Sequence, residues 1–317
     1  MPPVRALTTH PQTTPHIFMV RPVRFAYNEQ TSESNEFMDA EFAEETRLVA
    51  QEKALEEFEQ MVAKLSAAGV DLRVYEDTLD PYSPDSIFPN NWITTHRDGK
   101  LVLFPMMAPN RRVERRQDIV EDLKRNFKVE EVIDLTHFEQ EEKFLEATGS
   151  MVLDRRYKIA YACLSARTHP EVLSAFAEAT GYEVVSFSAS DDNGVVIYHT
   201  NVLMCVGDFF AVICLEAIKN EKERLHVCER LRETGKEVVE ISLDQMKNFA
   251  GNMLLVQSAE GAQLLVMSES AFRALTKVQC ATLESYAQIL STDLSVIEGN
   301  GGGSARCMMA EIHLPAL

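Results

Sequence analysis

Residues 151–187, MVLDRRYKIAYACLSARTHPEVLSAFAEATGYEVVSF, contain one complete unit of the pattern that decides the fold. Two short apolar runs, at 151–153 and 159–162, are separated by a charged turn and predict a β-hairpin. A helical period follows from Pro170 to Thr180, and the apolar stretch from Glu183 to Phe187 predicts a third strand. The order of the unit, which we call a module, is therefore hairpin, helix, strand.

The same module recurs along the chain with a period of roughly 50–60 residues, which is typical of repeat architectures. Further copies are predicted from hairpins at 92–104, 202–213 and 253–267, helices at 112–127, 217–234, 269–276 and 278–290, and closing strands at 129–135, 237–241 and 293–297. The two ends of the chain, with a strand at 17–20, a helix over 38–68 and a strand at 71–75, predict a fifth copy.

This repetition predicts an α/β protein with a radial arrangement of five ββαβ modules, a five-bladed α/β propeller, in a single domain over residues 1–317. A doubly wound sheet is the alternative, but it requires single strands between helices, and hairpins intervene here. No stretch of the chain resembles a linker.

Composition and charge exclude several classes of function. The net charge of −18 argues against nucleic acid or an anionic membrane surface as the main partner. No apolar run approaches the roughly 20 residues that span a bilayer, and residues 1–15 lack the apolar core of a signal peptide. The six cysteines have irregular spacing, which predicts reduced thiols in a cytoplasmic protein and no metal site.

The stretch 299–312, GNGGGSARCMMAEI, contains the candidate nucleophile. Four glycines within five positions are unfavourable in a helix or a paired strand and indicate a loop that a ligand approaches closely. Cys307 follows this loop, where backbone amides and Arg306 would favour a thiolate. The structural alternative is that Cys307 is a small buried apolar residue.

Polar clusters precede the first strand of several modules, at 88–92, 144–150, 198–202 and 250–253. In a radial arrangement these positions converge on one channel. Asparagine and glycine are common turn residues without another role, but a histidine, His199, and a carboxylate, Glu146, also occupy such positions. A cysteine with a histidine beside it is the standard pair for nucleophilic catalysis.

Together these residues resemble the guanidine-modifying, or pentein, superfamily, which includes arginine deiminases, dimethylarginine hydrolases, amidinotransferases and succinylarginine dihydrolases. The resemblance rests on the glycine-rich loop before Cys307, on His199-Thr-Asn201, on Glu146 ahead of a glycine and on Phe88-Pro-Asn-Asn91. It covers the whole chain and implies the same five-module propeller.

The resemblance implies roles for individual residues. Cys307 matches the covalent nucleophile, His199 the general acid and base, and Glu146 the carboxylate that holds the substrate nitrogen and orients the site. Arg167, in Ser-Ala-Arg-Thr at 165–168, matches an arginine that binds the substrate carboxylate. The implied chemistry needs no cofactor.

Two departures from the family pattern bear on the substrate. Guanidine-binding members carry aspartate where this chain has Asn91 and Asn201. An asparagine amide lacks the negative charge with which an aspartate pairs with a guanidinium. Unlike a carboxylate, it can also donate a hydrogen bond to a carbonyl oxygen. The pattern therefore resembles citrulline ureidase-type members, with a small neutral ureido substrate held by Asn90, Asn91, Asn201, Arg167 and Asp85.

Two alternatives stay open at the level of sequence. In the first, the protein is a deiminase, dihydrolase or amidinotransferase for arginine or a modified arginine, with Asp85 or Glu146 supplying the missing negative charge. In the second, the propeller binds a partner without catalysis. The sequence is also compatible with assembly into a homo-oligomer.

Overall fold

The computed structural model describes residues 11–317, and its strands form five three-stranded sheets of the same design. In each sheet the middle strand pairs antiparallel with the inner strand and parallel with the outer strand. The prediction of an α/β fold built from repeated ββαβ modules is therefore confirmed. The expectations for residues 1–10, part of the stretch without a signal-peptide core, lie outside the described residues.

Four of the sheets use strands that follow one another in the sequence. Their strands are β3 (Ile93–Thr95), β4 (Lys100–Leu103) and β5 (Glu131–Asp134); β6 (Met151–Asp154), β7 (Ile159–Cys163) and β8 (Glu183–Phe187); β9 (Met204–Val206), β10 (Phe210–Ile213) and β11 (Glu237–Glu240); and β12 (Leu254–Gln257), β13 (Gln263–Ser268) and β14 (Gln288–Thr292). Their crossover helices are α4 (Gln117–Asn126), α6 (Pro170–Thr180), α8 (Glu221–Glu233), and α10 (Glu269–Ala274) with α11 (Lys277–Glu284).

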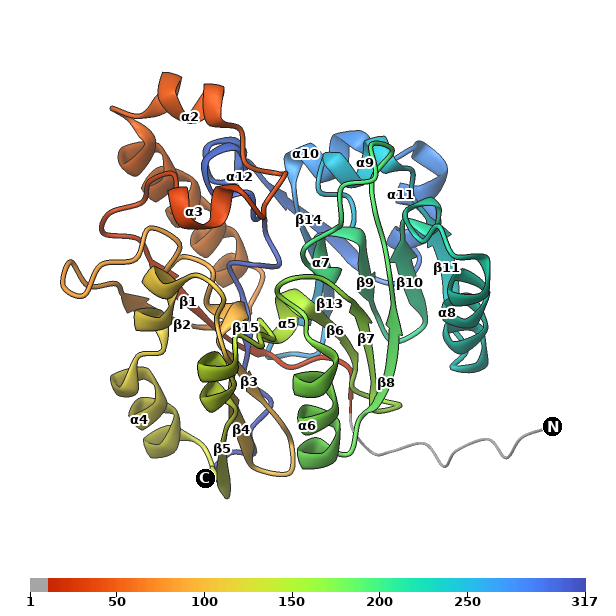
Figure 1. Cartoon of the computed structure of the whole chain (residues 1–317), viewed down its shortest axis with the longest axis horizontal. Helices are drawn as coiled ribbons and strands as arrows, with labels where there is room; N and C mark the ends of the chain where they lie inside the picture. Colours follow the sequence, from red (N-terminus) through yellow and green to blue (C-terminus); the bar gives the residue numbers. More distant parts are fainter. Residues whose placement is uncertain (1–10) are drawn as a thin grey trace.

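The fifth sheet joins the two ends of the described chain. Strand β1 (His16–Arg21) lies between β15 (Ala310–Glu311) and β2 (Asp71–Glu76), as Figure 1 shows in the left half of the molecule. Helices α1 (Glu29–Ser32), α2 (Ala40–Thr46) and α3 (Ala50–Ala67) connect β1 to β2. The predicted fifth module from the chain ends is confirmed.

The inner strands of successive modules are neighbours. β15 contacts β3, β6 contacts β9, and β9 contacts β12. Short helical turns precede three of these strands, namely η1 (Pro89–Asn91), α5 (Ala147–Ser150) and α7 (Thr200–Leu203), and α5 contacts both of the others. The polar residues before the first strand of each module are thereby brought to one end of the inner strands.

The module at 151–187 shows why these residues form these elements. Helix α6 begins with a proline at its first position, where the missing N–H costs nothing, after His169, whose side chain accepts from the Glu171 N–H at 3.3 Å. It ends at Gly181 with φ +74°, a left-handed cap that glycine adopts without strain. Its apolar face, including Val172 and Phe176, is buried.

Three predicted elements differ from the structure. The helix expected over 38–68 is divided into α2 and α3 by residues 47–49. The helix expected at 278–290 ends at Glu284, and the strand expected at 293–297 is instead β14, at 288–292. Residues 295–301 form α12 (Ser295–Gly301), although the glycine content argued against a helix there.

Tertiary contacts explain α12. Its first backbone N–H groups, of Val296 and Ile297, donate to the buried Glu57 carboxylate of α3 at 2.8 and 3.0 Å. A Cβ at Gly299 would lie 2.4 Å from the Phe42 ring of α2, so only glycine allows this approach. Contacts with α2 and α3 therefore outweigh the low helix propensity of glycine.

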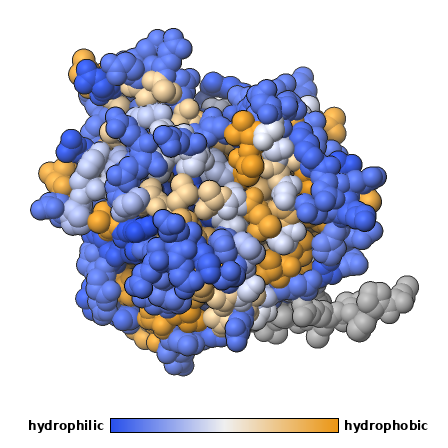
Figure 2. All heavy atoms as spheres, in the orientation of Figure 1, coloured by the Kyte–Doolittle hydropathy of each residue, from blue (hydrophilic) through white to orange (hydrophobic). Residues whose placement is uncertain are grey.

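Other short helical elements complete the chain: η2 (Pro109–Glu114), η3 (Thr136–Glu141), η4 (Leu215–Ala217) and α9 (Leu243–Lys247). No helix within residues 11–317 combines the length and the apolar character that crossing a membrane requires. Figure 2 shows a mainly hydrophilic periphery on this face of the molecule, as the strong acidic charge leads one to expect. The assignment of residues 1–317 to one domain stays a prediction.

Candidate active site

A small cavity lies where the short turns before β3 and β9 meet the glycine-rich stretch that follows α12. Five of the eight residues predicted for the site line it, and they come from four separate parts of the chain: Asp85 and Asn91, Arg167, His199, and Cys307. Glu146 lies directly behind the lining, bonded to His199, and Asn201 is bonded to Cys307.

The thiol of Cys307 is held by two asparagine amides. Asn201 Nδ2 and Asn252 Nδ2 each donate to Sγ at 3.3 Å. The Asn252 Oδ1 also accepts from the Arg306 N–H at 3.1 Å, which fixes the orientation of that amide. Two N–H donors therefore fix the position of the sulfur in the site.

His199 and Glu146 form a buried pair. The His199 Nε2 lies 2.8 Å from the Glu146 Oε2, and both side chains are almost fully buried. Burial lowers the pKa of His199 to about 4, although Glu146 acts in the opposite direction. The imidazole is therefore neutral at pH 7, and because a carboxylate only accepts, Nε2 carries the proton and Nδ1 is the basic nitrogen.

Glu146 remains ionised in spite of its burial. Burial would raise its pKa, but Arg167, the hydrogen bond from His199 and the charge of Arg111 outweigh this and hold the pKa below its usual value. Its Oε1 accepts from the Met107 N–H at 3.1 Å, and its Oε2 lies 3.5 Å from the Arg167 Nη1. Protein groups thus occupy both oxygens, which makes Glu146 an orienting group for His199.

Gly149 lets the histidine and the asparagine approach each other. A Cβ at this position would lie 2.4 Å from the Asn91 Nδ2 and 2.7 Å from the His199 Cε1. Any side chain there would have to displace one of the two. Glycine is required here because the site leaves no room for a side chain, and not because a turn needs its backbone freedom.

Asn91 is oriented by a buried arginine that the sequence analysis did not select. The Arg111 Nη1 donates to the Asn91 Oδ1 at 3.1 Å, so the Nδ2 of Asn91, which has no partner, is the free end of the amide. Arg111 also pairs with Glu114 at 2.8 Å and lies 3.6 Å from the Asp85 carboxylate. No sequence pattern distinguished Arg111 from its neighbours, because its role depends on a contact 20 residues away.

Arg167 is hydrogen-bonded to the segment 28–34, which directly precedes the cavity-lining residue Asn35. Its guanidinium donates to the Ser34 Oγ at 2.6 Å and to the Thr31 backbone carbonyl at 3.1 Å, and it stacks over the Tyr198 ring at 4.8 Å. Residues of the same segment hold Asp85, whose Oδ2 accepts from the Asn28 Nδ2 at 2.7 Å. The other oxygen, Asp85 Oδ1, has no partner.

Two predicted details differ. Asn90 is not among the lining residues; its Nδ2 donates to the Thr148 Oγ1 at 3.3 Å, so it joins two neighbouring turns. Asn252 occupies a position as central as Asn201, yet the sequence analysis placed it only in a polar cluster. Like Asn91 and Asn201, Asn252 stands just before the first strand of its module. This shared position was the signal that could have identified it.

Among residues 11–317, no three His, Cys, Asp or Glu side chains gather as a set of metal ligands. The site contains a thiol with two donors, a neutral imidazole oriented by a carboxylate, and free amide ends. Chemically, this set can perform nucleophilic addition at carbon with proton transfer.

Comparison with known proteins gives a match over most of the chain. The model of a family described as N,N dimethylarginine dimethylhydrolase, eukaryotic, matches residues 21–314. A search of curated proteins finds no significant match.

Solved structures give the same fold at low identity. The N-terminal domain of ArgZ, covalently bound to a reaction intermediate, superimposes with a TM-score of 0.72 at 17% identity, covering 95% of this chain and 99% of that domain. Whole ArgZ, an arginine dihydrolase of cyanobacteria, gives 0.74 at 18% identity, with 95% of this chain and 41% of ArgZ covered. A dimethylarginine dimethylaminohydrolase variant holding an S-methyl-L-thiocitrulline adduct gives 0.60 at 16% identity, covering 93% of this chain and 98% of that chain.

Proposed function

The chain belongs to the N,N dimethylarginine dimethylhydrolase family of cysteine-dependent C–N hydrolases, with the pentein fold, and from this premise we propose that its substrate is the ureido group of citrulline. The products are ornithine, ammonia and carbon dioxide. Cys307 acts as nucleophile and His199 as acid and base, with Glu146 orienting the histidine.

The observation that carries this proposal is the pairing of the two site asparagines. Arg111 occupies the Oδ1 of Asn91 and leaves its N–H₂ end free, whereas Asn201 uses its N–H₂ end on Cys307 and leaves Oδ1 without a partner. The lining thus offers a free donor from Asn91, and the unpartnered acceptors are Asp85 Oδ1 in the lining and Asn201 Oδ1 next to Cys307. A ureido group has a carbonyl oxygen and N–H groups, whereas a guanidinium has only N–H donors and would leave the Asn91 amide opposed to another donor.

The charges of the lining also favour a neutral group. Arg111 and Arg167 line the cavity, and Asp85 is the carboxylate among its lining residues. A guanidinium would have to share Asp85 with Arg111, which already lies 3.6 Å from that carboxylate, whereas a ureido group carries no charge and needs no counter-ion. The carboxylate of the amino acid, by contrast, is attracted by Arg167, and we assign that contact to it.

The reaction follows from these groups. The proton of the Cys307 thiol passes to the His199 Nδ1 while Sγ bonds to the ureido carbon. One C–N bond then breaks, and the departing nitrogen takes the proton from His199, so that the carbonyl remains on sulfur as a carbamoyl thioester. Water, deprotonated by His199, attacks this carbonyl and breaks the C–S bond. The released carbamate decays to carbon dioxide and an amine, so either order of C–N cleavage gives the same products.

The test is release of ornithine and ammonia from citrulline and from arginine, measured side by side. We expect turnover of citrulline, none of arginine, and none of either with Cys307→Ser, which retains the shape of the site. Asn201→Asp places a carboxylate beside the thiol, and we expect it to lower kcat/KM for citrulline by about 100-fold, as loss of a transition-state donor does. Unchanged turnover of citrulline by Cys307→Ser would refute the assigned nucleophile.

A second candidate substrate is arginine or a methylated arginine, and the observation that favours it is the unpartnered Asp85 Oδ1 in the cavity lining. That oxygen can accept from a guanidinium. Burial raises the pKa of Asp85, which weakens this attraction. Conversion of arginine to citrulline or ornithine, lost in Asp85→Asn, would establish this candidate and overturn the ureido assignment.

A further inference from the structure

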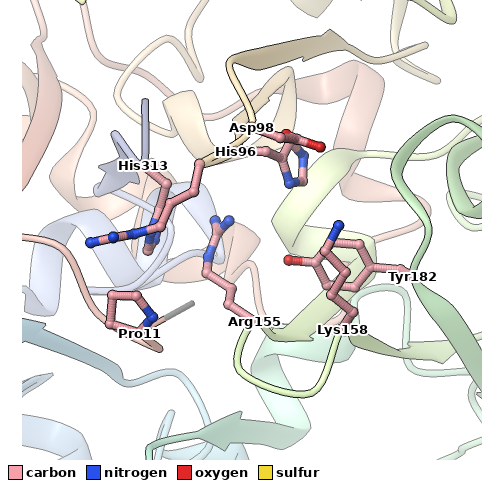
Figure 3. Close-up of a pocket in the computed structure, with 8 residues that line it drawn as sticks. Pro11, His96, Asp98, Arg155, Lys158, Tyr182 and His313 are labelled. Carbon is pink, nitrogen blue, oxygen red and sulfur yellow. The ribbon is translucent and has the colours of Figure 1, made fainter. Parts of the chain in front are cut away.

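A second, small pocket lies at the opposite end of β3 from the candidate active site. Asn91, just before this strand, lines the first cavity, and His96, just after it, lines the second. Figure 3 shows the Arg155 guanidinium between His313 on one side and Tyr182 and Lys158 on the other. None of these residues belongs to the proposed reaction.

Arg155 is a buried cation whose hydrogen-bonding capacity is only partly used. It is 5% exposed, its Nη1 donates to the Thr95 carbonyl at 3.1 Å, and its Nη2 lies 3.4 Å from the Glu311 Oε2. Its Nε is fully buried without a partner. A guanidinium has five N–H donors, so these contacts leave donors of Arg155 unused.

The buried charges near this cavity are not balanced. Glu311 interacts with both Arg155 and Arg306, so one carboxylate faces two buried guanidinium groups. Arg306, 4% exposed, also has an Nε without a partner. His313 bonds to the other oxygen of Glu311 at 2.9 Å, so each oxygen of that carboxylate already has a partner.

The rim adds further positive charge. Arg97 is exposed at the cavity, and Lys158 lines it while donating to the Thr180 carbonyl at 3.0 Å. The acidic residue of the rim, Asp98, is compensated by Lys100 at 3.3 Å. Excess positive charge at this point contrasts with the net charge of −18 for the whole chain.

The two histidines respond to this field. Burial, followed by the charge of Arg155, lowers the pKa of His96 well below its usual value and lowers the pKa of His313 to about 4. Both rings are neutral at pH 7. The one N–H of His313 is used on Glu311, whereas His96 Nε2 can accept from the Thr94 hydroxyl and leave Nδ1–H as a neutral donor.

We propose that this second cavity is a binding site for a small oxyanion. Arg155 supplies a buried forked donor, Arg97 and Lys158 supply charge at the rim, and His96 supplies a neutral donor. Guanidinium groups bind phosphate and carboxylate oxygens by paired, charge-assisted hydrogen bonds. The anion provides the negative charge that Arg155 and Arg306 lack in the protein itself.

The experiment is a titration of the full-length protein with inorganic phosphate at pH 7 and constant ionic strength. The readout is the NMR chemical shift of the histidine ring C–H groups, with exposed His226 as an internal control for bulk effects. We expect the signals of His96 and His313 to shift and to saturate below about 20 mM phosphate, which corresponds to weak specific binding. A parallel titration with acetate tells whether a carboxylate fills the same site.

Variants at the rim make the test independent of folding, because Arg155 is a buried partner of Glu311 and its replacement risks unfolding. Arg97→Gln with Lys158→Gln should weaken phosphate binding by about ten-fold, since two positive charges at the rim are removed. Arg47→Gln, at an exposed site elsewhere, is the matched control and should leave the affinity unchanged. Linear shifts that follow His226, or saturation unaffected by the rim variants, would overturn the proposal.

Discussion

Glu146 is the residue on which the protonation states of the candidate site depend. It accepts from His199 and Met107 and lies beside Arg167, so its charge is retained although its side chain is 0% exposed. The carboxylate in turn fixes which nitrogen of His199 carries the proton. A single buried carboxylate thereby determines that the imidazole presents a free base to the site.

This arrangement predicts the pH dependence of the reaction. The pKa of His199 is lowered to about 4, so the neutral base is present above that pH and is lost only as the pH falls through it. We expect kcat/KM for citrulline to fall on the acid side with an apparent pKa near 4, well below the value of about 6.5 for an ordinary histidine. A pH–rate profile checks this, and an acid limb at pH 6–7 would contradict it.

The lowered pKa of His199 also makes the stability of the fold depend on pH. Between about pH 6.5 and 4 the unfolded chain takes up the His199 proton before the folded state does, so this residue destabilises the fold as the pH falls through that window. Profiles of kcat/KM are therefore interpreted only where circular dichroism shows the protein folded.

Gly149 predicts an effect on catalysis that exceeds its effect on stability. In Gly149→Ala the new Cβ would meet the Asn91 Nδ2 and the His199 ring, and both must shift by several tenths of an ångström. Because misplacement of a catalytic group by about 1 Å can cost 100-fold, we expect kcat for citrulline to fall by about that factor.

The control for this variant is Gly194→Ala, at a glycine where a Cβ would meet nothing within 4 Å but φ is +81°. That substitution is strained by its backbone, not by contact with the site, and should leave kcat within about two-fold of the original protein. Equal loss of activity in both variants would mean that general destabilisation, and not the site contact, explains the first.

At the scale of elements, α12 is stabilised by packing although its glycine-rich sequence has a low helix propensity. Glu57 of α3 accepts its first N–H groups, and Phe42 of α2 covers Gly299. Gly302 then ends it with φ +61°, and the chain turns toward Cys307. The position of the candidate nucleophile thus depends on two helices from the other end of the chain.

Gly299→Ala tests this dependence. Alanine is intrinsically the better helix residue, but its Cβ would lie 2.4 Å from the Phe42 Cδ1. We expect a loss of about 1–3 kcal/mol in the free energy of unfolding, typical of overpacking. Urea denaturation measures it, and Phe42→Leu combined with Gly299→Ala should recover part of the loss. A more stable single variant would show that propensity, not packing, dominates here.

At the scale of the whole molecule, a buried ion pair links two neighbouring modules. The Lys236 Nζ, just before β11, lies 2.7 Å from the Asp154 Oδ2 at the end of β6, and both side chains are 0% exposed. The lysine also lies over the Tyr157 ring at 5.0 Å. Such a pair stabilises the fold weakly as a whole, but either charge alone would be buried without compensation.

We therefore expect Asp154→Asn to lower the free energy of unfolding by about 3–5 kcal/mol. The double variant Asp154→Leu with Lys236→Met, which removes both charges, should lie much closer to the original protein. Glu56→Gln, which breaks the exposed pair with Lys53, is the matched control and should cost less than about 1 kcal/mol. Equal costs for the single and double variants, measured by urea denaturation, would contradict this account.

Local patterns in the sequence determined the modules. Alternating apolar residues, the Pro170 start and the Gly181 end of α6 act over a few neighbours. The helix and the closing strand could therefore be predicted there to the residue, and the two hairpin strands to within one residue. The repetition of that order predicted five modules, including the one that the two ends share. Cys307, His199 and Glu146 could be selected because they occupy equivalent positions before or after inner strands.

Only the tertiary structure decided what depends on contacts between distant segments. Arg111 fixes the free end of Asn91, Asn252 joins Asn201 on the thiol, and Asn90 faces Thr148 outside the cavity lining. Contacts between distant segments also decide that α12 is a helix in spite of its glycine content. They likewise place the excess of buried positive charge around Arg155. Hydrogen-bond partners, burial and charge balance act through space, and a linear pattern records only which residues are available for them.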